Sequence, residues 1–239
     1  MCIRDSPFPD APGVSFDWAL VSFDGIRPPE LSATTTPGRV RLSDVQIGTY
    51  TYRVTYTSPD GCAGEDTVTF EKVSDTGVGE GLRFVISWRS PGDDDELVDP
   101  GTDVDLHVSR RVDGRTRWNG AEDCYYGNPE TDWGVRFEDA DNGRLLRDEV
   151  NGLGPEIIVI EEPALDEVYF VLAHYFSDSG FGASDVTLRV FRDGVQVTSL
   201  TETLRETGET WLAVEVRNGG ATIQPVDQLF RAFPPEDAP

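Results

Sequence analysis

Hydrophobic and polar residues alternate along most of this chain, with the two-residue period of β-strands. In the first third of the chain the alternation predicts strands over 14–20, 39–42, 48–56 and 66–73. Residues 74–81 have no hydrophobic period, so we expect them to form a linker.

From Leu82 onward the alternation continues, and Asp193-Gly194 between two alternating runs indicates a hairpin turn. No helix of convincing length is predicted. Strands are expected over 82–88, 103–108, 156–160, 168–176, 185–192, 196–200 and 210–217. The sequence therefore predicts an all-β protein of two antiparallel β-sandwich modules in tandem. The second is expected to be jelly-roll-like, with a long irregular insertion over 109–155.

The first module, residues 7–73, resembles an immunoglobulin-like domain of the PKD type. The resemblance rests on Trp18, on the strand that opens with Gly48-Thr-Tyr50 and on the hairpin that closes the module. It implies a sandwich whose core contains the tryptophan. One or two opening strands of such a domain are missing, so we expect this copy to be truncated.

The second module, residues 82–225, resembles the YfaP-like domain family of bacterial proteins. The resemblance rests on Trp88 followed by DVDLHV (103–108), CYYGN (124–128), DEVNGLGPE (148–156) and VYFVLAHY (168–175), in that order. In outline it is also similar to prepeptidase C-terminal sandwiches, which share a DxDLxV strand and often bind calcium. The resemblance implies a β-sandwich, and we expect residues 226–239 to form a C-terminal tail.

The predicted strand 103–108 has two faces of opposite character. The apolar face carries Val104, Leu106 and Val108. The polar face carries Asp103, Asp105 and His107. Such a polar row can coordinate a cation, hydrogen-bond a neighbouring loop or stay in water. Asp148 and Glu156 flank a Gly-Leu-Gly-Pro turn that would hold Glu156 at the entrance of the next strand.

These side chains define the predicted metal site. Its members are Asp103, Asp105, His107, Asp148 and Glu156. The carboxylates favour calcium (Ca²⁺), which prefers oxygen ligands, and the acidic loop 93–96 could supply more of them. Zinc is the less favoured candidate, and it is considered because the His107 imidazole is a common ligand of transition metals.

The second histidine of the chain, His174, lies on an otherwise apolar strand face. This position favours a core histidine that is hydrogen-bonded to a carbonyl or a carboxylate. The alternative joins His174 with His107 and Asp105, and optionally Glu156, in a transition-metal site.

Aromatic residues mark the predicted insertion, at Trp118, Tyr125, Tyr126 and Trp133. Half-exposed aromatic rings could stack on sugar rings or pack against a partner. Alternatively, they form a small core beneath the insertion.

Composition narrows the choice of partners. With 44 acidic and 20 basic residues the net charge is −24, which disfavours nucleic acid and anionic membrane surfaces. No segment is long and apolar enough to insert into a membrane. Other domains of the same polypeptide, extracellular proteins and glycans remain as partners. Motifs of hydrolases, metalloproteases and nucleotide-binding enzymes are lacking, so we expect no enzyme activity.

The N-terminal hexapeptide, residues 1–6, back-translates as ATG TGT ATA AGA GAC AG plus one base, the end of a sequencing-library adapter. We expect these residues to be read-through, with a signal peptide and earlier domains lost upstream. Cys62 and Cys124 stand in polar, loop-like contexts that suit an oxidising compartment. They could pair with each other, or Cys62 could have lost its partner upstream.

Together these observations predict a binding and spacer segment of a larger bacterial protein that is secreted, periplasmic or on the cell surface. We expect a divalent cation to stabilise it. The alternative is an accessory domain of a secreted hydrolase whose catalytic domain lies upstream.

Overall fold

The structure is a computed structural model that describes residues 13–25, 29–34, 38–43, 48–72, 81–94, 96, 100–134, 138–150 and 152–238. Every regular element in these residues is a β-strand, and all strand pairs are antiparallel, which confirms the all-β prediction. The described part of the chain contains no helix that could cross a bilayer.

The chain divides into two units, Met1–Asp75 and Thr76–Pro239. The division falls within the predicted linker, of which residues 74–80 lie outside the described part. The hexapeptide assigned to the adapter also lies outside it.

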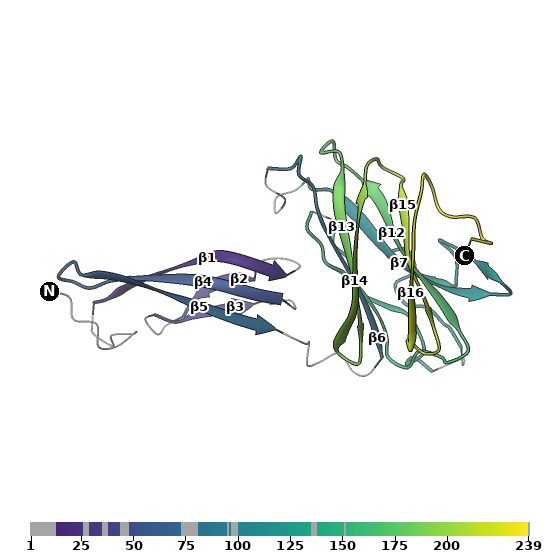
Figure 1. Cartoon of the computed structure of the whole chain (residues 1–239), viewed down its shortest axis with the longest axis horizontal. Coiled ribbons are helices and arrows are strands. Elements are labelled where there is room, and N and C mark those ends of the chain that lie inside the picture. The colour runs from purple at the N-terminus through teal and green to yellow at the C-terminus, as the bar shows by residue number, and fades with distance from the viewer. Residues whose placement is uncertain are drawn as a thin grey trace. The chain divides into compact units, whose positions relative to one another are not determined.

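The first unit contains a three-stranded sheet and a separate hairpin (Figure 1). The sheet has the order β1 (Ser15–Gly25), β4 (Gly48–Thr57), β5 (Ala63–Lys72), and the hairpin joins β2 (Glu30–Ala33) to β3 (Val40–Ser43). Alternate residues of β4, namely Tyr50, Tyr52 and Val54, are buried. Trp18 pairs with Val54 and is partly buried, so it lies beside this small core as predicted.

The second unit contains two large sheets (Figure 1). The sheet that we call the β6 sheet has the order β10 (Arg144–Arg147), β11 (Glu156–Ile160), β6 (Leu82–Arg89), β13 (Ser184–Arg192), β14 (Val195–Leu204). The β7 sheet has the order β16 (Thr222–Phe230), β15 (Thr210–Arg217), β12 (Val168–Ser177), β7 (Asp103–Val112), β8 (Arg115–Thr116). A short strand, β9 (Asp123–Cys124), also pairs with β7.

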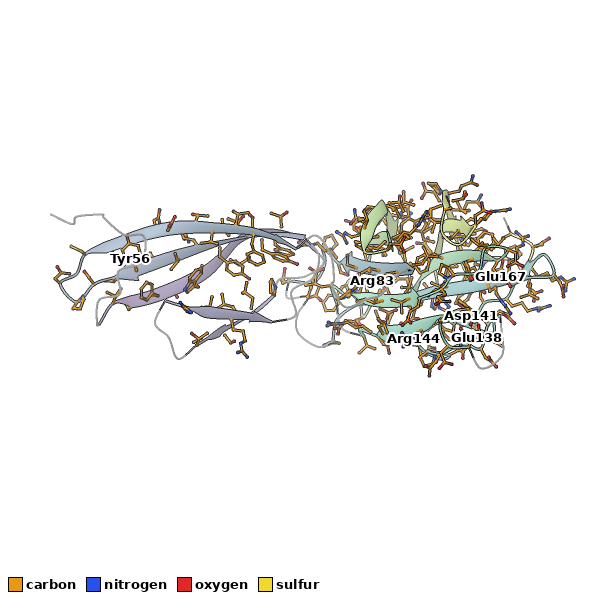
Figure 2. The ribbon with its side chains drawn as sticks, turned by 90° about the horizontal axis from the view of Figure 1, so that it is seen from below. Tyr56, Arg83, Glu138, Asp141, Arg144 and Glu167 are labelled. Carbon is orange, nitrogen blue, oxygen red and sulfur yellow. The ribbon has the colours of Figure 1, made fainter. Side chains whose placement is uncertain are left out.

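One buried apolar cluster joins the two sheets of the second unit. Alternate residues of β6, namely Phe84, Ile86 and Trp88, contribute from one side, and Leu106 of β7 contributes from the other. Trp88 is buried as predicted, and its indole Nε1 donates a hydrogen bond to the Thr102 carbonyl at 3.1 Å. Figure 2 draws the side chains and labels Arg83 on β6 and Arg144 on β10 of this unit. The second unit is therefore sandwich-like.

Two predicted boundaries are wrong. Residues 226–230 do not belong to a tail, because β16 continues to Phe230 and pairs with β15. Pro225 weakens the strand pattern there, although an edge strand such as β16 tolerates a proline. The insertion is also more regular than predicted, because β7 continues to Val112 and strands β8, β9 and β10 lie within it.

Candidate metal centre

The β7 strand carries the site on the face that points away from the apolar core. Val104, Leu106 and Val108 are fully buried in the core between the sheets, which confirms the predicted register. Asp105 and His107 face the other way, yet they are only 3% and 0% exposed. Their burial shows that this outer face is covered, and residues from the insertion and from the C-terminal segment provide the cover.

Three aromatic rings surround the His107 imidazole. Tyr125 stacks on it with ring centroids 4.9 Å apart, and Phe233 and Trp118 meet it edge-on at 5.2 and 6.2 Å. The C-terminal segment that brings Phe233 is held by the Thr210 hydroxyl, which donates to the Ala232 carbonyl at 2.7 Å. The imidazole therefore lies in an apolar, water-poor environment, where its polar atoms need partners.

The Nδ1 atom of His107 has a partner in Asp123 of β9. Nδ1 lies 2.7 Å from Asp123 Oδ2, which also accepts the Asn119 backbone N–H at 2.7 Å. Because a carboxylate accepts hydrogen bonds, it fixes the hydrogen on Nδ1, and a neutral ring then presents a lone pair at Nε2. Nε2 is buried and has no hydrogen-bond partner among the described residues.

His174 lies beside Asp105 and not in the core between the sheets. The two residues pair across β12 and β7, and His174 Nδ1 lies 3.2 Å from Asp105 Oδ2. The prediction that His174 lies in the core was therefore wrong. The prediction that a carboxylate is its hydrogen-bond partner is confirmed. Asp105, His107 and His174 each place one potential ligand atom within 4.8 Å of those of the other two.

Glu156 reaches the same strand from the β6 sheet. It is the first residue of β11, as predicted, and its Oε2 accepts the backbone N–H of Leu106 at 2.6 Å. On this side of β7, strand β9 pairs only with Val108 and Ser109, so Glu156 provides the acceptor that a neighbouring strand would otherwise supply.

The turn before Glu156 is fixed by its backbone. Gly152, Leu153 and Gly154 have φ values of 50°, 56° and 71°, in the left-handed region. The Gly152 N–H donates to the Thr102 carbonyl at 2.9 Å, and the Leu153 carbonyl accepts the Trp88 N–H at 3.3 Å. These contacts tie the turn to β6 and to the start of β7, and they hold Glu156 at the edge of β7.

A second group of potential ligands contains only carboxyls. Asp103, Asp105 and Glu156 each place one oxygen within 4.8 Å of those of the other two. Oδ1 of Asp103 and Oε1 of Glu156 are buried and make no hydrogen bond of normal length and angle in the described part of the chain. Asp105 belongs to both groups, so the two potential metal positions share a ligand.

Burial and mutual repulsion alter the acidity of these carboxyls. Burial, followed by the charge of Asp105, raises the pKa of Asp103 to about 7. Burial is also the main cause that raises the pKa of Glu156 well above its usual range, although the Leu106 N–H opposes this shift. The protein therefore holds protons on this group at a pH where free carboxyls have lost them.

The other predicted ligands belong to neither group. Asp148 is exposed and contributes no atom to either group, although its side chain hydrogen-bonds the Glu156 carboxyl and its charge contributes to the raised pKa values of Asp103 and Glu156. In the acidic loop, Glu96 Oε1 accepts the backbone N–H of Ser90. Asp95 lies outside the described residues.

The predicted ligand-stacking aromatics separate into three environments. Trp133 is 1% exposed within the main core, so it cannot stack on a ligand. Trp118 and Tyr125 cover His107 and are partly buried, which fits the alternative of a small core beneath the insertion. Tyr126 is 47% exposed and meets Phe176 edge-on at 5.9 Å.

Sequence reasoning missed Asp123 and Phe233. Asp123 stands next to the CYYGN segment, and the only available signal was its place beside that motif. Phe233 lies beyond the predicted end of the module, where no alternation remained to place it. Both residues are brought to the site by long-range contacts.

Cys124 is buried and carries a free thiol, so it does not pair with Cys62. The predicted loop context of Cys124 is also wrong, because this residue lies in β9. Burial raises the pKa of the thiol, which keeps it protonated and unreactive.

Comparison of the chain with family models, curated proteins and solved structures found no match. The resemblances to PKD-type and YfaP-like domains remain predictions from their motifs. The function is therefore inferred from the geometry of the site.

Proposed function

We propose that the second unit is a non-catalytic binding module that is stabilised by one divalent cation, with calcium as the preferred ion. The observation that carries the proposal is the convergence of Asp103, Asp105 and Glu156 at the open edge of β7. Two buried carboxyl oxygens of this group lack ordinary hydrogen bonds, and a cation would satisfy both.

The dimensions of the group suit calcium. Calcium lies about 2.3–2.6 Å from each oxygen ligand, so two ligands on opposite sides of the ion are at most about 5 Å apart. The three oxygens lie within 4.8 Å of one another, which allows one ion to contact all three. Backbone carbonyls and water would complete the six to eight ligands that calcium prefers.

We propose that the chain serves as a binding and spacer segment of a larger secreted, periplasmic or cell-surface protein. The net charge of −24 supports a role away from nucleic acid and anionic membranes. The exposed pair Tyr126 and Phe176 gives the second unit an aromatic surface that suits an extracellular protein or a glycan. A metal bound at β7 would act as a structural element in such a module.

Calcium should raise the melting temperature of the full chain. At a free calcium concentration of about 100 times the dissociation constant the gain is about 2.7 kcal/mol. This gain corresponds to about 5–10 °C for a unit of this size. Thermal melts followed by tryptophan fluorescence, with chelator and with calcium, measure the shift.

The variant Glu156→Gln should lose this response and still fold. Glutamine retains an oxygen that can accept the Leu106 N–H, but it carries no charge to bind calcium. Glu206→Gln is the matched control, because Glu206 is exposed and outside the ligand groups. An equal calcium response in all three proteins, or none in the wild type, would refute the proposed calcium site.

The calcium response should also grow with pH. Without cation, the folded state binds a proton at Asp103 up to about pH 7, whereas the usual aspartate pKa is 3.8. Stability therefore falls as the pH rises between these two values. Calcium requires the ionised carboxyls, so the difference between the calcium and chelator melts should be larger at about pH 8 than at about pH 5.5. The opposite trend would contradict the assignment of these ligands.

A further inference from the structure

We propose that His107, His174 and Asp105 form a second metal position, which selects a transition-metal dication of the zinc type over calcium. This position shares Asp105 with the carboxyl group described above, so it rests in part on the proposed function. The ligand that distinguishes the two positions is imidazole, which binds transition metals well and calcium poorly.

The Nε2 atom of His107 is buried and has no hydrogen-bond partner among the described residues. The ring is fully buried among three aromatic side chains, and Nδ1 is occupied by Asp123. A buried nitrogen without a partner destabilises the folded state, because it has lost its hydrogen bonds to water. A metal ion bound to the lone pair at Nε2 would remove this cost.

The ligand atoms around Asp105 have a spacing that suits a zinc ion. Two ligands about 2.0–2.1 Å from a tetrahedral zinc ion lie about 3.3–3.4 Å apart. His174 Nδ1 and Asp105 Oδ2 are 3.2 Å apart, close to this spacing. On metal binding the hydrogen of His174 would move from Nδ1 to Nε2, and the lone pair of Nδ1 would then be free to coordinate the ion.

A carboxylate outside the ligand set orients His107. Histidines that bind metals usually donate their other ring N–H to a carboxylate, which orients the ring and raises its basicity. Asp123 holds this position for His107, and the Asn119 N–H fixes Asp123 in turn. Two imidazoles and one carboxylate leave a fourth tetrahedral position for water. The His174 side chain is 17% exposed, so it lies on the solvent side of the group.

Cobalt(II) and zinc(II) titrations of the full chain, prepared without a histidine tag, test the proposal. His107 and His174 are the only histidines of the chain, so any imidazole ligation must come from them. We expect one equivalent of cobalt to give the visible absorption of a four-coordinate ion, and zinc to displace it. Loss of a group outside the coordination sphere lowers metal affinity by about 10–100-fold. Loss of a direct ligand should cost more, so we expect His174→Gln to lower zinc affinity by at least about 100-fold.

Glu156→Gln separates this proposal from the calcium site. Glu156→Gln should abolish the calcium-dependent melting shift and leave zinc affinity within about threefold of the wild type. His174→Gln should lower zinc affinity and leave the calcium-dependent melting shift unchanged. Near-ultraviolet circular dichroism checks that each variant is folded, and His174 is chosen over the fully buried His107 for this reason. Zinc affinity that is unchanged in His174→Gln, or cobalt spectra without four-coordinate absorption, would overturn the proposal. Zinc binding that persists in a protein without any calcium response would refute the calcium site alone.

Discussion

Replacing Asp123 with alanine should lower the free energy of unfolding by about 2–6 kcal/mol, because two donors would each lose their acceptor at a cost of about 1–3 kcal/mol. The His107 Nδ1 and the Asn119 N–H would both lose their acceptor, and the His107 side chain is fully buried. Thermal unfolding should show a midpoint lower by about 10 °C. Zinc affinity should fall by about 10–100-fold, because the imidazole loses the group that orients it.

Asp123→Asn is the matched variant, because its amide oxygen can still accept both hydrogen bonds. We expect Asp123→Asn to lower the free energy of unfolding by less than half as much as Asp123→Ala does. Asp166→Ala, at an exposed turn residue, should change stability by less than about 0.5 kcal/mol. If Asp123→Ala melts like the wild type, then Asp123 does not support His107, and the basis for the zinc position is lost.

Replacing Gly154 with alanine should destabilise the second unit by about 2–5 kcal/mol. The φ of 71° costs an alanine about 1–2 kcal/mol. The new Cβ would lie 2.8 Å from the Trp88 ring, and overpacking a core costs a further 1–3 kcal/mol or so. The turn would have to shift and would carry Glu156 with it, so the calcium response should shrink as well. Chemical denaturation with and without calcium measures both effects.

Gly114→Ala separates the backbone strain from the steric contact. Gly114 has nearly the same φ, 75°, and a Cβ built there meets no atom within 4 Å. This variant should therefore cost about 1–2 kcal/mol and leave the calcium response unchanged. Equal losses in the two variants would show that Trp88 does not constrain the turn.

The all-β class and most strand positions could be predicted from the sequence, because a two-residue alternation leaves little freedom in how a strand presents its faces. The same alternation predicted Val104 in the core and Asp105 on the opposite face. The Gly-Leu-Gly-Pro turn predicted Glu156 at a strand entrance, since its glycines allow positive φ. These features depend on local sequence, and the structure confirms them.

The composition of the site could not be predicted in the same way. His174 joins Asp105 because β12 pairs with β7 in one register, over a separation of about seventy residues. Asp123 and Phe233 reach His107 from the insertion and the C-terminal segment, and no periodic pattern places either of them. Asp148, which is near Glu156 in sequence, remains exposed.

The sequence by itself determined most of the strands and the apolar face of β7, because backbone geometry and hydrophobic burial act locally. The tertiary structure alone decided whether a polar face meets water or a neighbour. On β7 the C-terminal segment and the insertion cover that face, and burial then raises the pKa of Asp103 and leaves His107 Nε2 without a partner. These long-range contacts change a polar strand face into a candidate metal centre, because desolvation makes unpaired charges and lone pairs costly.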